Sequence, residues 1–133
     1  MKVYVFGNPD VPNDNKALEA AEMLKSKVKD VEFIYVSPNE DLPFSEERKV
    51  VIMDVIQGID KVKLIDLRDT DKLISPPRTS THDFDLGFQL KYLKKLGKLK
   101  EIKIIGIPIK GRADYFIIQS ILRKLVAQDM QGS

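Results

Sequence analysis

The sequence contains no cysteine among its 133 residues. This absence excludes disulfide bonds, thiolate metal sites and a cysteine nucleophile. Long apolar runs are lacking too: Val3-Tyr4-Val5-Phe6, near the N-terminus, is far shorter than the hydrophobic region of an export signal or a membrane span. We therefore expect a soluble cytoplasmic protein that does not act in a membrane.

Several familiar catalytic motifs are missing as well. Gly7-Asn8-Pro9 lacks the further glycines of a dinucleotide or phosphate loop, which argues against a nucleotide site there. His82 is the single histidine, so a His-Glu-x-x-His zinc motif is excluded, and no Ser-His-Asp arrangement can be assembled from the pattern. Conventional serine or zinc peptidase chemistry is therefore not expected.

The composition that remains is that of a globular protein. Hydrophobic residues make up 43% and charged residues 32% of a chain whose length suits one domain, so we expect a single domain over residues 1–133. Basic residues number 22 against 20 acidic ones and are spread along the chain, which predicts no nucleic-acid partner. In the Lys-rich run from Lys91 to Lys103, leucine and isoleucine recur as on a buried face, which favours a solvated helix face over a basic patch.

Strand-like and helix-like patterns alternate along the sequence. Runs of β-branched and aromatic residues predict strands over residues 2–6, 31–36, 49–55, 61–67 and 101–107. Helical spacing of apolar residues predicts helices over about residues 17–28, 83–96 and 114–127, the first of them capped by Asn13 or Asp14. The short connection between residues 55 and 61 suggests that the strands on either side of it form an antiparallel pair.

This alternation predicts the fold class. Strands joined through helices give an α/β protein of three layers, α/β/α, with a mostly parallel sheet of about five strands, one antiparallel pair and helices on both faces. In such sheets ligands bind at the carboxyl ends of the strands.

Three polar side chains fall where that rule places a site. Asp14 follows the first strand, Asp54 stands at the end of the third, and His82 lies in the loop that leads to the second helix. Two carboxylates and one imidazole form a ligand set that suits a divalent ion such as nickel or zinc, with positions left for substrate.

Each of the three also has a structural interpretation. Asp14 precedes a helix and is well placed as an N-cap. Asp54 interrupts an apolar strand near its exit, where a polar side chain often caps the following turn. His82 belongs to Ser80-Thr81-His82-Asp83, which is also a good helix start. Taken one at a time, these residues leave the structural and the functional interpretation open.

Taken together, the motifs resemble a known family. Gly7-Asn8-Pro9 after a first strand, Asp14 six residues past Asn8, Val51-Ile52-Met53-Asp54 closing an inner strand and Ser80-Thr81-His82 opening a helix resemble the hydrogenase maturation endopeptidases. Leu86-Gly87, after His82, matches the helix of that family, and the resemblance spans nearly the whole chain.

The resemblance implies an activity and a site. It implies an endopeptidase that removes a C-terminal extension from the large-subunit precursor of a nickel-iron hydrogenase. Asp14, Asp54 and His82 would be both the metal-binding and the catalytic residues. The nickel would arrive with the substrate, and the protein would hold no tightly bound cofactor of its own.

One feature departs from the family and supports a rival interpretation. The family follows its paired acids with a Gly-x-Gly pattern, whereas this chain reads Asn13-Asp14-Asn15-Lys16-Ala17. The alternative is therefore a non-catalytic module or chaperone of the same fold, which binds metal or precursor without cutting. A second alternative, an unrelated α/β enzyme or nucleotide binder, is disfavoured because no phosphate loop is present.

Overall fold

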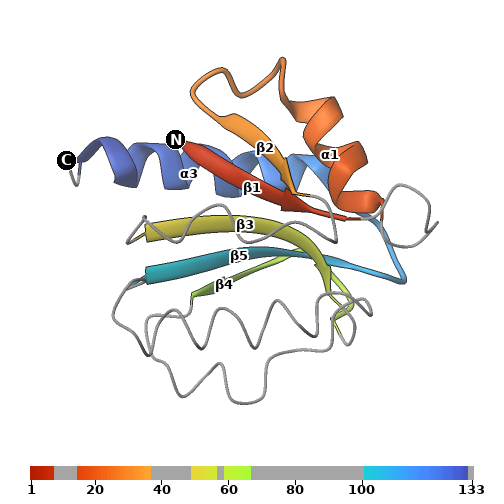
Figure 1. Ribbon diagram of the computed structural model, residues 1–133. Helices are drawn as coiled ribbons and strands as arrows, with labels where there is room; N and C mark the ends of the chain where they lie inside the picture. Colours follow the sequence, from red (N-terminus) through yellow and green to blue (C-terminus); the bar gives the residue numbers. More distant parts are fainter. Residues whose placement is uncertain (8–14, 37–48, 57–58, 67–100, 132–133) are drawn as a thin grey trace.

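The computed structural model of the protein describes residues 1–7, 15–36, 49–56, 59–66 and 101–131. These residues form five strands and two helices (Figure 1). The strands are β1 (Lys2–Phe6), β2 (Glu32–Val36), β3 (Lys49–Ile56), β4 (Lys63–Asp66) and β5 (Glu101–Pro108). The helices are α1 (Lys16–Leu24) and α3 (Tyr115–Gln131). The helix predicted over residues 83–96 lies outside the described residues.

The five strands form one sheet in the order β2-β1-β3-β5-β4. β1 runs parallel to both of its neighbours, β2 and β3, and β5 runs parallel to β3 along eight register positions. β4 is the antiparallel member at one edge. The mostly parallel sheet of five strands with one antiparallel pair is therefore confirmed.

The antiparallel pair has a different partner from the one predicted. The sequence suggested that residues 61–67 return beside residues 49–55, but β4 pairs with β5, which lies between β3 and β4 (Figure 1). The reason is burial. β5 is an apolar strand whose central and final residues are buried, and such a strand is most stable with neighbours on both sides. A short connection fixed the direction of β4 but not its neighbour.

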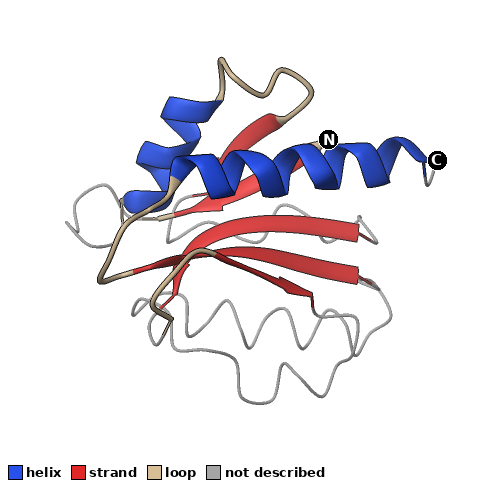
Figure 2. Ribbon diagram, turned by 180° about the vertical axis from the view of Figure 1, so that it is seen from behind, coloured by secondary structure: helices blue, strands red, loops and turns tan. Residues whose placement is uncertain are grey.

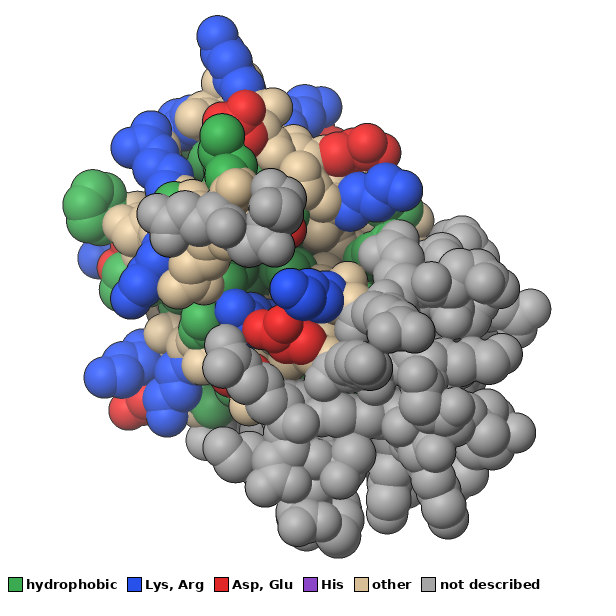
Figure 3. Space-filling model, turned by 90° about the vertical axis from the view of Figure 1, so that its left-hand side faces the viewer, with side chains coloured by type: hydrophobic (Ala, Val, Ile, Leu, Met, Phe, Trp, Pro, Cys, Tyr) green, Lys and Arg blue, Asp and Glu red, His purple; other side chains and the backbone are tan. Residues whose placement is uncertain are grey.

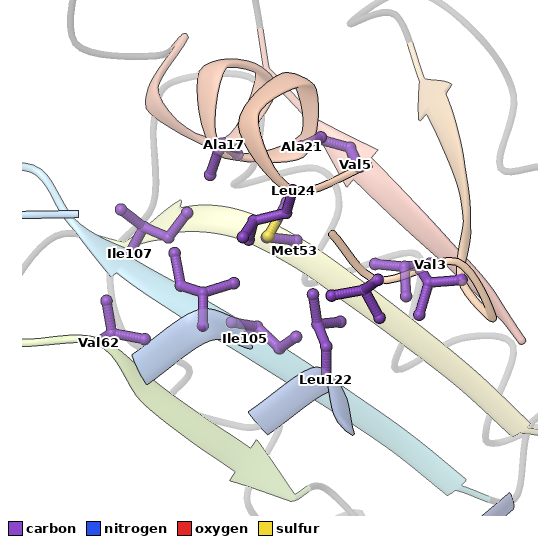
Figure 4. Close-up of a cluster of buried hydrophobic side chains, with 14 of the residues drawn as sticks. Val3, Val5, Ala17, Ala21, Leu24, Met53, Val62, Ile105, Ile107 and Leu122 are labelled. Atoms are coloured by element: carbon purple, nitrogen blue, oxygen red, sulfur yellow. The ribbon is translucent and has the colours of Figure 1, made fainter. Parts of the chain in front are cut away.

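One face of the sheet packs against both described helices. Figure 2 shows α1 and α3 on the same side of the sheet. Figure 4 shows the buried side chains that lie between these helices and the strands. α1 buries small residues and one leucine at helical spacing, which lets its backbone approach the strands closely. We call this face, with its helices, the helix-covered face. Its buried residues include Val3, Val5, Ala17, Ala21, Leu24, Met53, Val55, Ile105, Ile107, Ile118 and Leu122.

The opposite face of the sheet is buried as well. Its apolar cluster comes from the alternate residues of the same strands and is joined by one residue of β2. We call it the second face. Its buried apolar residues are Tyr4, Phe6, Val36, Val50, Ile52 and Ile102. A sheet buried on both faces is the middle layer of a three-layer α/β/α fold, as the sequence predicted.

The helix starts have local causes. α3 begins at Tyr115 because the Asp114 carboxylate accepts hydrogen bonds from the backbone N–H groups of Phe116 (3.1 Å) and Ile117 (3.3 Å), as an N-cap does. α1 begins at Lys16 with Asn15 in the N-cap position, so the predicted cap at Asn13 or Asp14 came one or two residues too early. Among the described residues, neither helix combines the length and the apolar character that crossing a membrane requires.

Candidate functional site

The carboxyl ends of four strands meet at one edge of the sheet. β1, β2, β3 and β5 are parallel, so the ends at Phe6, Val36, Ile56 and Pro108 lie at the same edge. This is the edge at which α/β proteins bind their ligands. We call it the carboxyl edge.

Asp54 lies in β3, two residues before the strand ends at this edge. Alternation along β3 places it on the second face, where Val50 and Ile52 precede it. Its register partner in β5 is Gly106. The side chain is 1% exposed, and among the described residues it is the one buried side chain of an acidic or basic residue.

The Asp54 carboxylate is held by its own strand. Its Oδ1 accepts a hydrogen bond of 2.8 Å from the backbone N–H of Val55. This bond lies inside the strand. The predicted structural role, a cap on the turn after β3, concerns residues 57–58, which lie outside the described residues. A buried carboxylate at a position where the alternation calls for an apolar residue costs free energy, and such positions are enriched in functional sites.

The other two predicted ligands, Asp14 and His82, lie outside the described residues. Their convergence with Asp54 therefore remains a prediction. Within the described part of the chain, no three acidic or histidine side chains lie close enough together to hold a metal ion.

The structure adds a residue that the sequence analysis missed. Lys16, the first residue of α1, reaches the carboxyl edge and donates hydrogen bonds to the backbone carbonyl groups of Pro108 (3.0 Å), Ile109 and Gly111 (3.1 Å). These partners lie 92 to 95 positions away in the sequence, so no local pattern reports the contact. A weak signal existed: a lysine at a helix start opposes the helix dipole and calls for another explanation.

Charged groups elsewhere in the structure are mostly at the surface. Figure 3 shows lysine and arginine side chains interspersed with acidic ones on one side of the molecule, in keeping with the spread of basic residues along the sequence. Glu101 and Lys103 in β5, which are half-buried, form an ion pair of 3.3 Å.

A phenol with a raised pKa lies at the rim of the helix-covered face. Tyr35 of β2 donates a hydrogen bond of 2.7 Å to Glu22 of α1. Burial, with the hydrogen bond and the negative charge of Glu22, raises the pKa of Tyr35 to about 12. The hydrogen bonds from Lys25 and Tyr35 lower the pKa of the Glu22 carboxyl.

The comparisons with known proteins bear on the fold. No protein-family model and no curated protein matches the sequence. Solved structures do match over nearly the full length of both chains. The [NiFe] hydrogenase maturation protease HybD from Thermococcus kodakarensis has a TM-score of 0.59 at 20% identity, covering 95% of this chain and 99% of that one. The hydrogenase maturating endopeptidase HybD from E. coli has a TM-score of 0.55 at 16% identity, covering 99% and 91%.

A third structure has the same fold without a stated activity. An uncharacterized protein from Wolinella succinogenes has a TM-score of 0.58 at 13% identity, covering 96% of this chain and 97% of that one. The chain therefore has the fold of the hydrogenase maturation proteases, as the resemblance of its motifs implied. At these identities the likeness establishes the fold, and the activity has to be argued from the site.

Proposed function

We propose that this protein is a hydrogenase maturation endopeptidase, which removes a C-terminal extension from the large-subunit precursor of a nickel-iron hydrogenase. The observation that carries the proposal is the buried Asp54 carboxylate at the carboxyl edge. It stands in a fold whose solved relatives include two proteins named as hydrogenase maturation proteases. Burying an ionisable side chain is costly to stability, so its position calls for a function.

The surroundings of Asp54 suit a metal ligand. Carboxylates that bind metal are usually oriented by a hydrogen bond from a neighbouring group, which fixes the side chain. In β3 the Val55 N–H fills this role at Oδ1. The strand itself is rigid, because it pairs with β1 on one side and with β5 on the other.

Asp14 and His82 complete the proposed ligand set. The three side chains supply two oxygens and one nitrogen, an incomplete set that does not close around an ion as a structural four-ligand site does. We therefore expect the protein to hold no tightly bound metal of its own. Nickel already inserted in the precursor would provide the missing ligands from the substrate side.

The substrate's nickel would then orient the precursor and act on the scissile bond. A divalent ion beside a peptide carbonyl polarises that carbonyl as a Lewis acid. Holding the scissile bond in a fixed position lowers the entropic cost of bringing the reactants together. Water adds to the carbonyl carbon, the C–N bond breaks, and the new amine takes up a proton. Asp14, Asp54 and His82 would thus recognise a precursor that already carries nickel and, by the same contact, enable its cleavage.

Two substitutions test the assignment of the site. Asp54→Asn keeps the shape and an acceptor for the Val55 N–H but removes the charge, and His82→Ala removes the imidazole. Both variants should remain folded and lose at least about 10- to 100-fold in nickel affinity or in processing of a nickel-loaded precursor, because losing a ligand should cost no less than losing a group that only orients one. Asp60→Asn, at an exposed aspartate between β3 and β4, is the matched control. Processing at the normal rate by either site variant would refute the assignment.

The second candidate function is a precursor-binding module that does not cut. The observation that favours it is the segment Asn15-Lys16-Ala17 in place of glycines, with Lys16 bonded to the end of β5. Mass spectrometry of a nickel-loaded precursor incubated with the protein separates the two. Loss of the C-terminal peptide supports the peptidase, and a stable complex of unchanged mass supports the binding module.

A further inference from the structure

Lys16 makes contacts that its place in α1 does not explain. Its ammonium group has three N–H donors, and three backbone carbonyl groups of one turn accept from it: those of Pro108, Ile109 and Gly111. We call this arrangement the Lys16 clamp. It joins the first residue of α1 to the carboxyl end of β5.

The start of a helix is an unfavourable place for a lysine. The backbone N–H groups of the first turn carry partial positive charge, which repels a cation and attracts an anion. Charge-assisted hydrogen bonds to the carbonyl groups offset this repulsion. Lys16 therefore stabilises the contact between α1 and the end of β5, and its presence at this position is not explained by the stability of α1 alone.

The turn is also restricted on its far side. Gly111 has φ +109°, a conformation that other residues rarely adopt. A methyl group in place of its hydrogen would lie 3.3 Å from the backbone carbonyl oxygen of Asp60, in the segment between β3 and β4. The turn after β5 is thus held between the start of α1 and the end of the β3–β4 connection.

The clamped turn adjoins the strand that carries the proposed ligand. Gly106, the register partner of Asp54, is two residues before Pro108. Along the sequence, Lys16 also follows Asp14 by two residues. The clamp therefore fixes how α1, which the chain enters just after Asp14, stands against the β3–β5 pair.

We propose that Lys16 is a positioning residue that fixes the carboxyl edge for metal recognition by holding the turn after β5 to the start of α1. The inference rests on the proposed function for its effect on nickel, whereas the clamp itself is tested without it. Removing a group that orients a metal ligand typically changes metal affinity by about 10- to 100-fold, and Lys16, which acts through the turn after β5, should fall near the lower end of that range.

The test compares Lys16→Met with Lys25→Met in the full-length protein. Methionine keeps much of the aliphatic length and loses all three donors, and Lys25 is an exposed lysine just after α1 whose ion pair is with Glu22. The turn carries its own reporters, because Lys110 and Arg112 are exposed and trypsin cuts after both. Mass spectrometry follows cleavage at these two sites, and calorimetry follows binding of added Ni²⁺.

We expect Lys16→Met to be cut after Lys110 and Arg112 about tenfold faster or more, because local opening exposes the turn. Its Ni²⁺ affinity should fall about tenfold or more, and both values should stay unchanged in Lys25→Met. Unchanged proteolysis at the two sites would overturn the clamp. Faster proteolysis with normal Ni²⁺ affinity would overturn the positioning role.

Two further comparisons separate the remaining cases. If Lys16→Met does not fold, Lys16→Arg serves in its place, because a planar guanidinium cannot direct its protons as an ammonium does. A third variant, Lys16→Ala, tests whether an added cation can replace the missing ammonium group. Ammonium ions, which have N–H donors, should slow its proteolysis more than tetramethylammonium ions at equal ionic strength, and equal effects would contradict the hydrogen-bonded clamp. Because ligands of the precursor complete the proposed site, a wild type that binds no free Ni²⁺ is compared with Lys16→Met by the rate of processing of a nickel-loaded precursor, and the proteolysis still decides whether the clamp exists.

Discussion

The two faces of the sheet are built from alternate residues of the same strands, yet they differ in what they bury. The helix-covered face is lined by aliphatic side chains from strands and helices (Figure 4). The second face begins in the same way with Ile52 and then places Asp54 at the carboxyl edge. Because the strands are shared, the difference is one of chemistry and not of scaffold. One set of strands can therefore carry an apolar core on one face and an ionisable side chain within the apolar core of the other.

The largest effect should come from the helix-covered face. Leu122 in α3 is fully buried there, so Leu122→Ala leaves a cavity and should lower the free energy of unfolding by about 2–5 kcal/mol. Phe116→Ala, on the same helix at a residue that is 76% exposed, should change it by less than about 0.5 kcal/mol. Urea denaturation measures both. A small loss for Leu122→Ala would mean that this face is not the main source of stability.

A smaller loss in the free energy of unfolding is expected for Gly106→Ala, which adds a methyl group where the second face is tightly packed. A methyl group at Gly106 would lie 2.7 Å from Ile56 Cδ1 and 3.2 Å from Ile59 Cδ1. Both atoms are the ends of flexible side chains, so Gly106→Ala should cost about 1–3 kcal/mol by urea denaturation while the variant still folds. Since Gly106 is the partner of Asp54, we also expect weaker binding of Ni²⁺. Wild-type stability in this variant would show that the second face has space to spare.

A substitution of Asp54 should have a smaller effect on the free energy of unfolding than those in the apolar parts of the two faces. Asp54→Asn removes the ionisable group and keeps an acceptor for the Val55 N–H, so the free energy of unfolding should change by no more than about 1 kcal/mol. The same denaturation experiment measures it. A loss of about 3 kcal/mol or more would show that the carboxylate is structural, and the contrast between the faces would disappear.

The smallest effect concerns the polar rim of the helix-covered face. The pKa of Tyr35, about 12, lies above the ordinary value of 10.0, so the neutral phenol favours the folded state. This contribution is complete below about pH 10 and is lost as the pH rises through about 12. Glu22→Gln should lower the pKa of Tyr35, because it removes the adjacent negative charge. Phenolate absorbance measures this pKa, with Tyr35→Phe to assign the signal. An unchanged pKa of Tyr35 in Glu22→Gln would contradict the prediction.

The sequence predicted those features that depend on local patterns. Val50-Val51-Ile52-Met53 predicted a buried strand because β-branched and apolar residues run without a break, and Asp54 stood out against that run. The place of β4 could not be predicted, because a short connection sets direction while the burial of β5 selects the neighbour. The Lys16 clamp joins residues more than 90 positions apart and is visible only in three dimensions. The predicted roles of Asp14 and His82 depend on residues outside the described part of the chain.

The dependence of cleavage on the substrate's nickel is measured by comparing two forms of one precursor. Nickel-loaded and nickel-free hydrogenase large-subunit precursor are incubated with the protein at equal concentration, and release of the C-terminal peptide is followed by mass spectrometry. A chelator added to the loaded form is the control. We expect that only the loaded form is cut, because the substrate's metal would complete the ligand set of Asp14, Asp54 and His82. Equal cleavage of both forms would contradict this expectation.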